Sequence, residues 1–241
     1  QIHASVKGLH RAGVVIGVFN DLNVLVAGNE AYFIDSDSYQ FGPFLCNMFT
    51  HRFLDPTLSN PLAPELTLTK PYTTASDWYA YSVMLMQSLL FVGPYGGVYR
   101  PKVGKLIPPD KRSLKRITVF HPDVIYPKPA VPLKYLSDDL LSYFERVFGK
   151  DFRAEFPESL VTTLRWVKGI QCGLEHMRNV CPNCKSTASP VVKKQLTQVR
   201  GQVVATRVFQ TSGLILLAGV NNGKLEYIYN YNVQFFREGA N

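Results

Sequence analysis

The chain has 241 residues, a formal net charge of +8 at pH 7, and a composition that is 46% hydrophobic and 12% aromatic. That is enough apolar surface for the core of one medium-sized domain with a small appendage. The longest apolar stretch with helical character, residues 83–92, is too short to cross a bilayer, and the sequence contains no internal repeat. These features exclude a membrane-spanning or repeat architecture and predict a cytoplasmic protein with no membrane partner.

A β-hairpin is predicted near the start of the chain. Two short apolar runs, residues 24–27 and 31–34, flank the turn sequence Gly28-Asn29-Glu30. Asn23 precedes the first run and Asp35 follows the second. Because the two ends of a hairpin lie side by side, we expect these two polar side chains to come together.

Helices are predicted further along the chain. Ser76 is a suitable N-cap for a helix that starts at Asp77 and runs to Val92, where Gly93-Pro94 ends it. Residues 137–148 and 157–168 have apolar side chains at helical spacing. The Pro-rich stretch between the first predicted helix and the two later ones is predicted to be loop.

The hairpin region resembles the catalytic and metal-binding loops of a protein kinase. In that family a general-base Asp lies five residues before an Asn that holds one metal ion, and a second metal-binding Asp follows a short hairpin. Asn23 and Asp35 stand at the two metal positions, with Asp37 as an alternative to Asp35. The base position carries Val18, and Asn20 replaces the usual Lys two residues later.

Later landmarks follow in the kinase order. Leu62-Ala63-Pro64-Glu65 resembles the motif that closes the activation segment, and Asp77 resembles the Asp that holds the catalytic-loop backbone. Arg153 resembles the Arg that follows a late helix in the family and pairs with the glutamate of the Ala-Pro-Glu motif. The resemblance therefore implies an ion pair between Glu65 and Arg153. It also implies contact between Asp77 and the backbone of residues 16–18.

The resemblance is to the carboxy-terminal lobe of a bacterial eukaryotic-like Ser/Thr protein kinase, and it covers about residues 5–168. It implies an α+β chain with a mainly helical, kinase-like large lobe over residues 1–168. A zinc-binding module over 169–188 and a β-rich segment over 189–241 would follow. No Gly-rich loop precedes the lobe, so we expect this sequence to be a fragment whose N-terminal lobe is missing.

The second signal is a group of cysteines. Cys172, His176, Cys181 and Cys184 form the pattern C-x3-H-x4-C-x2-C, a ligand set that can close a tetrahedral structural zinc (Zn) site. The alternative is a disulfide between two of these cysteines. Cys46 lies far from them in the sequence and is predicted to be a small packed side chain.

The end of the chain is rich in β-forming residues. Residues 203–210, 213–220 and 224–231 are predicted strands, and Asn221-Asn222-Gly223 is a turn signal between the last two. We expect a small antiparallel meander.

Basic residues cluster between Arg100 and Arg116, with Asp110 as the one acidic residue among them. The segment is either a solvated loop or a docking face for an acidic protein or nucleic acid, since clustered Lys and Arg attract polyanions.

Three functional hypotheses follow from these patterns. The first is a protein kinase-like enzyme that uses Mg²⁺ and ATP to phosphorylate Ser/Thr on a protein substrate, impaired here by Val18. The second is a pseudokinase scaffold that still binds nucleotide. The third is a zinc-stapled binding module for an acidic protein or nucleic acid.

Overall fold

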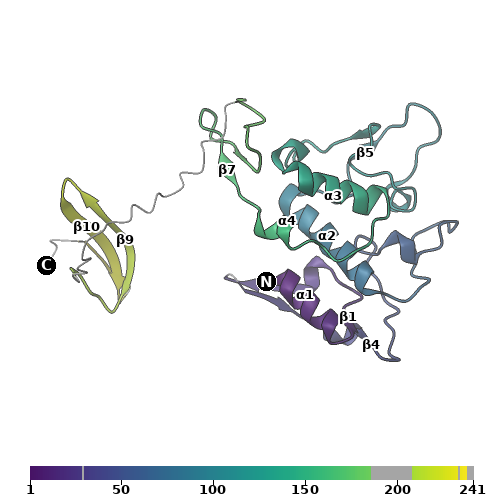
Figure 1. Cartoon of the computed structure of the whole chain (residues 1–241), viewed down its shortest axis with the longest axis horizontal. Helices are drawn as coiled ribbons and strands as arrows, with labels where there is room; N and C mark the ends of the chain where they lie inside the picture. Colours follow the sequence, from purple (N-terminus) through teal and green to yellow (C-terminus); the bar gives the residue numbers. More distant parts are fainter. Residues whose placement is uncertain (29, 186–207, 233, 238–241) are drawn as a thin grey trace. The chain divides into compact units, whose positions relative to one another are not determined.

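The computed structural model describes residues 1–28, 30–185, 208–232 and 234–237. The chain forms two compact units, Gln1–Lys193 and Lys194–Asn241. The first unit holds the helices and most of the candidate site residues, and the second is a small sheet (Figure 1).

Helix α2, Thr74–Leu90, lies at the centre of the first unit. It begins earlier than predicted because Thr73 caps it: the Thr73 hydroxyl accepts from the Ser76 N–H at 3.1 Å, and the Ser76 hydroxyl accepts from the Thr73 N–H at 2.8 Å. Ser76 is therefore inside the helix as the second half of a capping box. Phe91, in the left-handed conformation, ends it.

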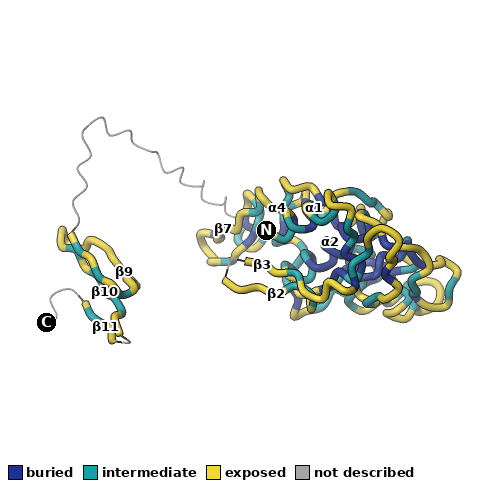
Figure 2. The backbone as a smooth tube through the Cα atoms, turned by 90° about the horizontal axis from the view of Figure 1, so that it is seen from below, coloured by how far each residue is buried: buried dark blue, intermediate teal, exposed yellow. Residues whose placement is uncertain are grey.

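Three further α-helices belong to the first unit: α1 (Ile2–Arg11), α3 (Asp138–Gly149) and α4 (Ser159–Thr162). Val6 of α1 and Phe144 and Phe148 of α3 are fully buried in the same core as the α2 side chains. Figure 2 shows this buried core around α2, with exposed chain at the periphery. The predicted helix at residues 137–148 is thus confirmed, whereas that at 157–168 shrinks to the four residues of α4.

The strands of the first unit pair into short antiparallel ladders: β1 (Val14–Val15) with β4 (Gln40–Phe41), β2 (Val24–Ala27) with β3 (Glu30–Phe33), β5 (Val98–Tyr99) with β6 (Val124–Ile125), and β7 (Val167–Lys168) with β8 (Glu175–His176). The β2–β3 pair is the predicted hairpin. Its register places Val24 opposite Phe33 and Ala27 opposite Glu30. Short 3₁₀ turns cover Asp21–Asn23, Ser36–Ser38, Pro56–Leu58, Pro109–Lys111 and Leu133–Tyr135.

The expectation of a mainly helical, kinase-like large lobe is wrong. Helices cover 27% of the described residues, and strands in small antiparallel sheets cover 20%. The chain contains 16 prolines, many of them in the connections on either side of α2. Proline lacks a backbone N–H and fixes φ, so these connections fold as loops and single turns instead of helices.

The second unit is a three-stranded antiparallel sheet in the order β11–β10–β9. Strands β9 (Leu214–Asn221) and β10 (Lys224–Tyr231) lie where the sequence predicts them, and β11 (Gln234–Arg237) extends the sheet. Asn222 and Gly223 both have positive φ, at 48° and 76°, as the tight turn between β9 and β10 requires. The third predicted strand covers residues 203–210. Residues 203–207 lie outside the described residues, and residues 208–210 do not form a strand.

Candidate functional site

A buried carboxylate holds the loop that follows β1. Asp77 of α2 is fully buried, and its Oδ2 and Oδ1 accept from the backbone N–H groups of Ile16 at 2.8 Å and Gly17 at 3.0 Å. His10 Nε2 also contacts Asp77 Oδ2 at 2.8 Å. The predicted contact of Asp77 with this backbone is confirmed.

The loop itself is ordered by the side chains of two asparagines, Asn20 and Asn23. Asn20 Oδ1 accepts from the backbone N–H groups of Leu22 and Asn23, which starts the 3₁₀ turn. The side-chain amides of Asn20 and Asn23 both donate to the carbonyl oxygen of Val18, at 3.3 and 3.1 Å. The Val18 side chain packs against a small apolar cluster that includes Cys46, which is buried as predicted. Val18 therefore offers its backbone oxygen to the loop and no acid or base.

Asp35 sits where the chain leaves β3, in the left-handed conformation with φ 63° and ψ 46°. A hydrogen bond and the charge of Asp37 raise the pKa of Asp35, and a hydrogen bond from Asn23 opposes this rise. Both carboxylates are exposed and Asn23 is half-buried. The hairpin thus places Asn23 next to Asp35, and Asp37 next to Asp35 in turn.

The atoms that two carboxylates and an amide can offer to a cation are oxygens, which suit a hard cation such as Mg²⁺ better than a soft one. Val18 and Asn20 lie in the same loop as Asn23, but neither contributes an ionisable group. The catalytic and metal-binding roles of these four positions stay predictions.

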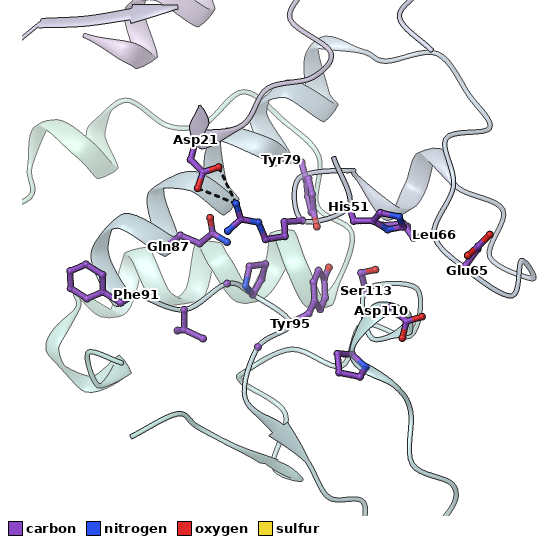
Figure 3. Close-up of a pocket in the computed structure, with 16 residues that line it drawn as sticks. Asp21, His51, Glu65, Leu66, Tyr79, Gln87, Phe91, Tyr95, Asp110 and Ser113 are labelled. Atoms are coloured by element: carbon purple, nitrogen blue, oxygen red, sulfur yellow. Dashed lines mark hydrogen bonds and ion pairs between the residues drawn. The ribbon is translucent and has the colours of Figure 1, made fainter. Parts of the chain in front are cut away.

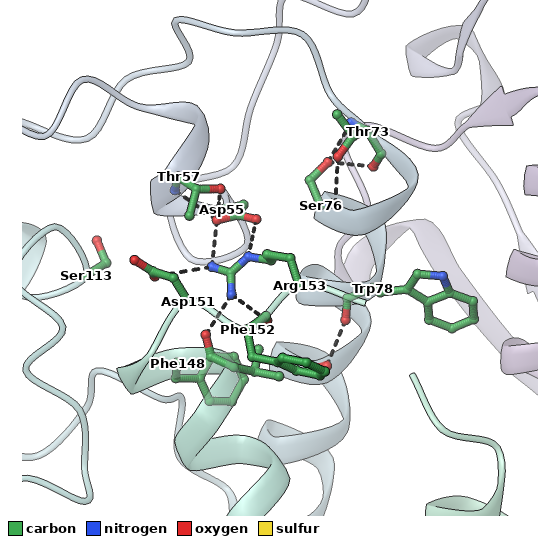
Figure 4. Close-up of polar contacts among 12 residues, drawn as sticks. Asp55, Thr57, Thr73, Ser76, Trp78, Ser113, Phe148, Asp151, Phe152 and Arg153 are labelled. Atoms are coloured by element: carbon green, nitrogen blue, oxygen red, sulfur yellow. Dashed lines mark hydrogen bonds and ion pairs between the residues drawn. The ribbon is translucent and has the colours of Figure 1, made fainter. Parts of the chain in front are cut away.

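Arg153 forms its ion pair with a different residue from the one expected. Arg153 pairs with Asp55, Nε to Oδ2 at 2.6 Å and Nη2 to Oδ1 at 2.7 Å, while Glu65 is exposed (Figure 4). The predicted Glu65–Arg153 pair is therefore wrong. Burial opposes the Arg153 charge, but its bond to Asp55 outweighs that effect and raises its pKa. The guanidinium also stacks over the Tyr79 ring at 4.6 Å.

A cavity of about 860 Å³, which sequence reasoning missed, opens in the first unit (Figure 3). Its walls are largely aromatic and apolar, with Tyr79 and Tyr95 among them, and an exposed ion pair between Asp21 and Arg52 lies at its edge. Its volume is within the usual range for ligand-binding clefts. The one signal for it in the sequence is Gly93-Pro94, whose turn ends α2 and contributes to the wall.

Some of the basic side chains between Arg100 and Arg116 make contacts within the protein. Arg112 is buried and donates to the Gly97 carbonyl at 2.8 Å, and Arg116 pairs with Asp151 at 2.5 Å. Four exposed cations remain in the segment: Arg100, Lys102, Lys105 and Lys115. This weakens the case for a continuous docking face for polyanions.

The three C-terminal cysteines of the first unit lie close together and could bind a metal. The Cys172 sulfur lies 3.5 Å from that of Cys181 and 3.6 Å from that of Cys184, and all three sulfurs lie within 4.8 Å of one another. A tetrahedral zinc ion with bonds of about 2.3 Å has sulfurs about 3.8 Å apart. No disulfide joins any two of these three cysteines in the described part of the chain, so the disulfide alternative does not hold in this structure.

The pKa of the Cys181 thiol is raised. The backbone N–H of Cys184 favours the thiolate, but lost hydration and the neighbouring thiols of Cys184 and Cys172 favour the protonated form more strongly. A bound metal cation would reverse this balance and deprotonate the thiols.

His176 is not part of the close group. Its ring is fully buried in β8, and its Nδ1 accepts from the Arg178 N–H at 3.1 Å. Within the described residues, its Nε2 has no hydrogen-bond partner. The role of His176 as fourth ligand stays a prediction.

No protein-family model matches the chain, and no curated protein shows significant sequence similarity to it. None of the helices in the described part of the chain is both long and apolar enough to span a membrane.

Proposed function

We propose that the Asn23–Asp35 pair binds a divalent cation, Mg²⁺, that holds the phosphates of ATP, as the corresponding loops of protein kinases do. The observation that carries the proposal is the placing of Asn23 and Asp35 side by side at the two ends of the hairpin. There the Ile34 N–H donates to the Asn23 carbonyl at 3.0 Å, and the Asn23 side chain lowers the pKa of the Asp35 carboxyl. The anchoring of the preceding loop by Asp77 supports it, because a metal site needs ligands on a fixed backbone.

Phosphoryl transfer from this site is impaired because Val18 occupies the position of the general base. Transfer depends mainly on positioning and charge, so the loss of a base slows it by about 10²- to 10⁴-fold and need not abolish it. The chain then acts as a weak Ser/Thr kinase or as a pseudokinase scaffold. Two observations bear on its partners.

The first observation is an exposed apolar surface beside the cation site. Leu22, Val26 and Tyr32 have 75%, 69% and 49% of their surface exposed. A lobe that corresponds to the N-terminal lobe of protein kinases would cover these side chains and the nucleotide. The second observation is the cavity, whose edge includes Asp21, two residues from Asn23. A substrate segment bound there would lie next to the loop that carries Asn23.

We also propose that the three cysteines bind zinc and that this zinc site stabilises the segment after α4. Two sulfur separations, 3.5 and 3.6 Å, are close to the distance of about 3.8 Å expected around zinc. The segment from β7 to Lys185 has few buried side chains of its own, so a metal would stabilise it.

The experiment that tests the cation site uses Mn²⁺, a paramagnetic substitute for Mg²⁺, on this chain. Mn²⁺ should broaden the NMR signals of Asn23 and Asp35 at low occupancy, and Asn23→Ala and Asp35→Asn should remove the broadening. Glu145→Gln on the exposed face of α3 is the control, because it makes the same charge change as Asp35→Asn at an exposed helical site. Equal broadening in Asp35→Asn and Glu145→Gln would reject the proposal.

A further inference from the structure

The cysteine group is built from two turns of the same geometry. In the first, the Gly173 N–H donates to the Gly169 carbonyl at 2.7 Å; in the second, the Lys185 N–H donates to the Cys181 carbonyl at 3.0 Å. In each turn the donor is four residues after the acceptor and has a left-handed φ, 65° for Gly173 and 53° for Lys185. The two turns therefore share one backbone form.

The ligand positions of these turns correspond. The second turn supplies thiols from its first and fourth residues, Cys181 and Cys184. The first turn supplies a thiol from its fourth residue, Cys172, while its first residue is Gly169. By this correspondence, position 169 is where a fourth thiol would stand.

The surroundings of Gly169 agree with this reading. A Cβ placed on Gly169 would lie 2.7 Å from the Cys181 sulfur and 2.9 Å from the Cys172 sulfur. The φ of Gly169 is outside the left-handed region, so its backbone does not require glycine. The closest atoms to such a Cβ are the two sulfurs, followed by the Cys181 Cβ at 3.3 Å, which means that position 169 faces the thiol group.

We propose that the metal bound by Cys172, Cys181 and Cys184 has an open fourth position on the side of Gly169, which takes an exogenous thiol. The proposal rests on the metal site proposed above. Metal sites with three protein ligands and one exchangeable position are of the reactive kind, whereas four protein ligands make a closed structural site. This replaces the expectation that the site is closed.

The exchange step is a simple ligand substitution. Solvent leaves the fourth position, the sulfur of the incoming thiol bonds to the metal, and the thiol proton goes to bulk solvent. No group is oxidised or reduced. The competing arrangement is closure of the site by His176 Nε2, which is buried without a hydrogen-bond partner among the described residues.

Co²⁺ in place of zinc provides the test, because its absorption spectrum reports the ligands. The whole chain is titrated with Co²⁺ and then with 2-mercaptoethanol. One Co²⁺ per chain with a sulfur-to-metal band that grows on thiol addition is the expected result. Absence of Co²⁺ and Zn²⁺ binding would reject the metal site itself, whereas binding with a spectrum that ignores the thiol would reject only the open position.

Matched variants locate the open position. Gly169→Cys should make the Co²⁺ spectrum insensitive to added thiol and tighten Zn²⁺ binding by about 10- to 100-fold, the range that supporting groups contribute at other metal sites. Gly169→Ser, which differs by one atom, should not tighten it. If Gly169→Cys does not fold, the wild-type titration decides alone. If the Co²⁺ spectrum does not respond to added thiol in the wild-type protein but does respond in His176→Gln, the fourth ligand is His176 and the proposal is overturned.

Discussion

Arg153 and Asp55, 98 residues apart in the sequence, form a two-pronged ion pair with contacts of 2.6 and 2.7 Å. The Asp55 side chain is 2% exposed and the Arg153 side chain 14%. Asp55 also accepts from the backbone N–H and the hydroxyl of Thr57, so both of its oxygens are engaged. The pair ties the turn at Pro56–Leu58 to the chain that follows α3.

Removal of this carboxylate should destabilise the first unit strongly. Asp55→Asn leaves the largely buried guanidinium with only the exposed carboxylate of Asp151, 3.7 Å from its Nη2. The free energy of unfolding should therefore fall by about 3 to 5 kcal/mol. Glu65→Gln makes the same chemical change at an exposed site and should alter it by less than about 0.5 kcal/mol. Urea unfolding measures both. Equal losses in the two variants would contradict the assignment of Asp55 as the partner.

The buried Asp77 should control the order of the loop at Ile16 and Gly17. Asp77→Ala leaves two backbone N–H groups without acceptors, each at a cost of about 1 to 3 kcal/mol when buried. Hydrogen exchange at the Ile16 and Gly17 amides should accelerate in this variant. Asp77→Asn keeps one acceptor oxygen and should retain partial protection. Unchanged exchange in Asp77→Ala would show that other contacts hold the loop.

The titration of Asp35 should respond to its two neighbours in opposite directions. Asp37 raises the Asp35 pKa and Asn23 lowers it, so Asp37→Asn should move the midpoint down and Asn23→Ala should move it up. A raised pKa keeps Asp35 protonated to higher pH, so on acidification cation binding should be lost at a higher pH in wild type than in Asp37→Asn. NMR of the side-chain carboxyl carbons measures the midpoints. Shifts of the same sign in both variants would be inconsistent with the hydrogen-bond arrangement.

A carboxylate at position 18 should restore acid–base assistance. We expect Val18→Asp to raise the rate of phosphate transfer from Mg²⁺-ATP to Ser/Thr peptides by about 10²- to 10⁴-fold. Val18→Asn has nearly the same size and cannot act as a base, so it should not raise the rate. Since Val18 packs against an apolar cluster, circular dichroism must first show that both variants fold. A folded Val18→Asp protein that binds Mn²⁺ and shows no rise in transfer would count against the assigned role of position 18.

Metal removal should loosen the cysteine segment before the rest of the first unit. The Gly173 and Lys185 amides donate within the two turns that carry the thiols, and the Gly169 amide donates to the Leu174 carbonyl just after the first turn. A chelator should increase their hydrogen exchange while the Ile16 amide, held by Asp77, stays protected. Simultaneous loss of protection at all four amides would mean that the segment and the core unfold together.

The sequence alone was sufficient where structure depends on near neighbours. Two apolar runs on either side of the Gly28-Asn29-Glu30 turn signal predicted the β2–β3 hairpin, and that hairpin in turn predicted that Asn23 and Asp35 would lie side by side. Apolar spacing predicted α3. The C-x3-H-x4-C-x2-C spacing predicted that four ligands would converge; the three cysteines do, and His176 is not in their close group. In each case a few consecutive backbone angles decide the outcome, and residue preferences report on those angles directly.

Distant contacts were decided by tertiary packing. Glu65 follows a motif-like Ala-Pro and Asp55 precedes a proline, so local sequence does not distinguish them as partners of Arg153; the burial of Asp55 against the core does. The position of Gly169 beside the cysteine sulfurs was likewise not predicted, because a glycine has no side chain to suggest a ligand. Only the fold of its turn against the one that begins at Cys181 places it beside two sulfurs. Such relationships depend on how separate segments pack together, and spacing along the chain does not encode that.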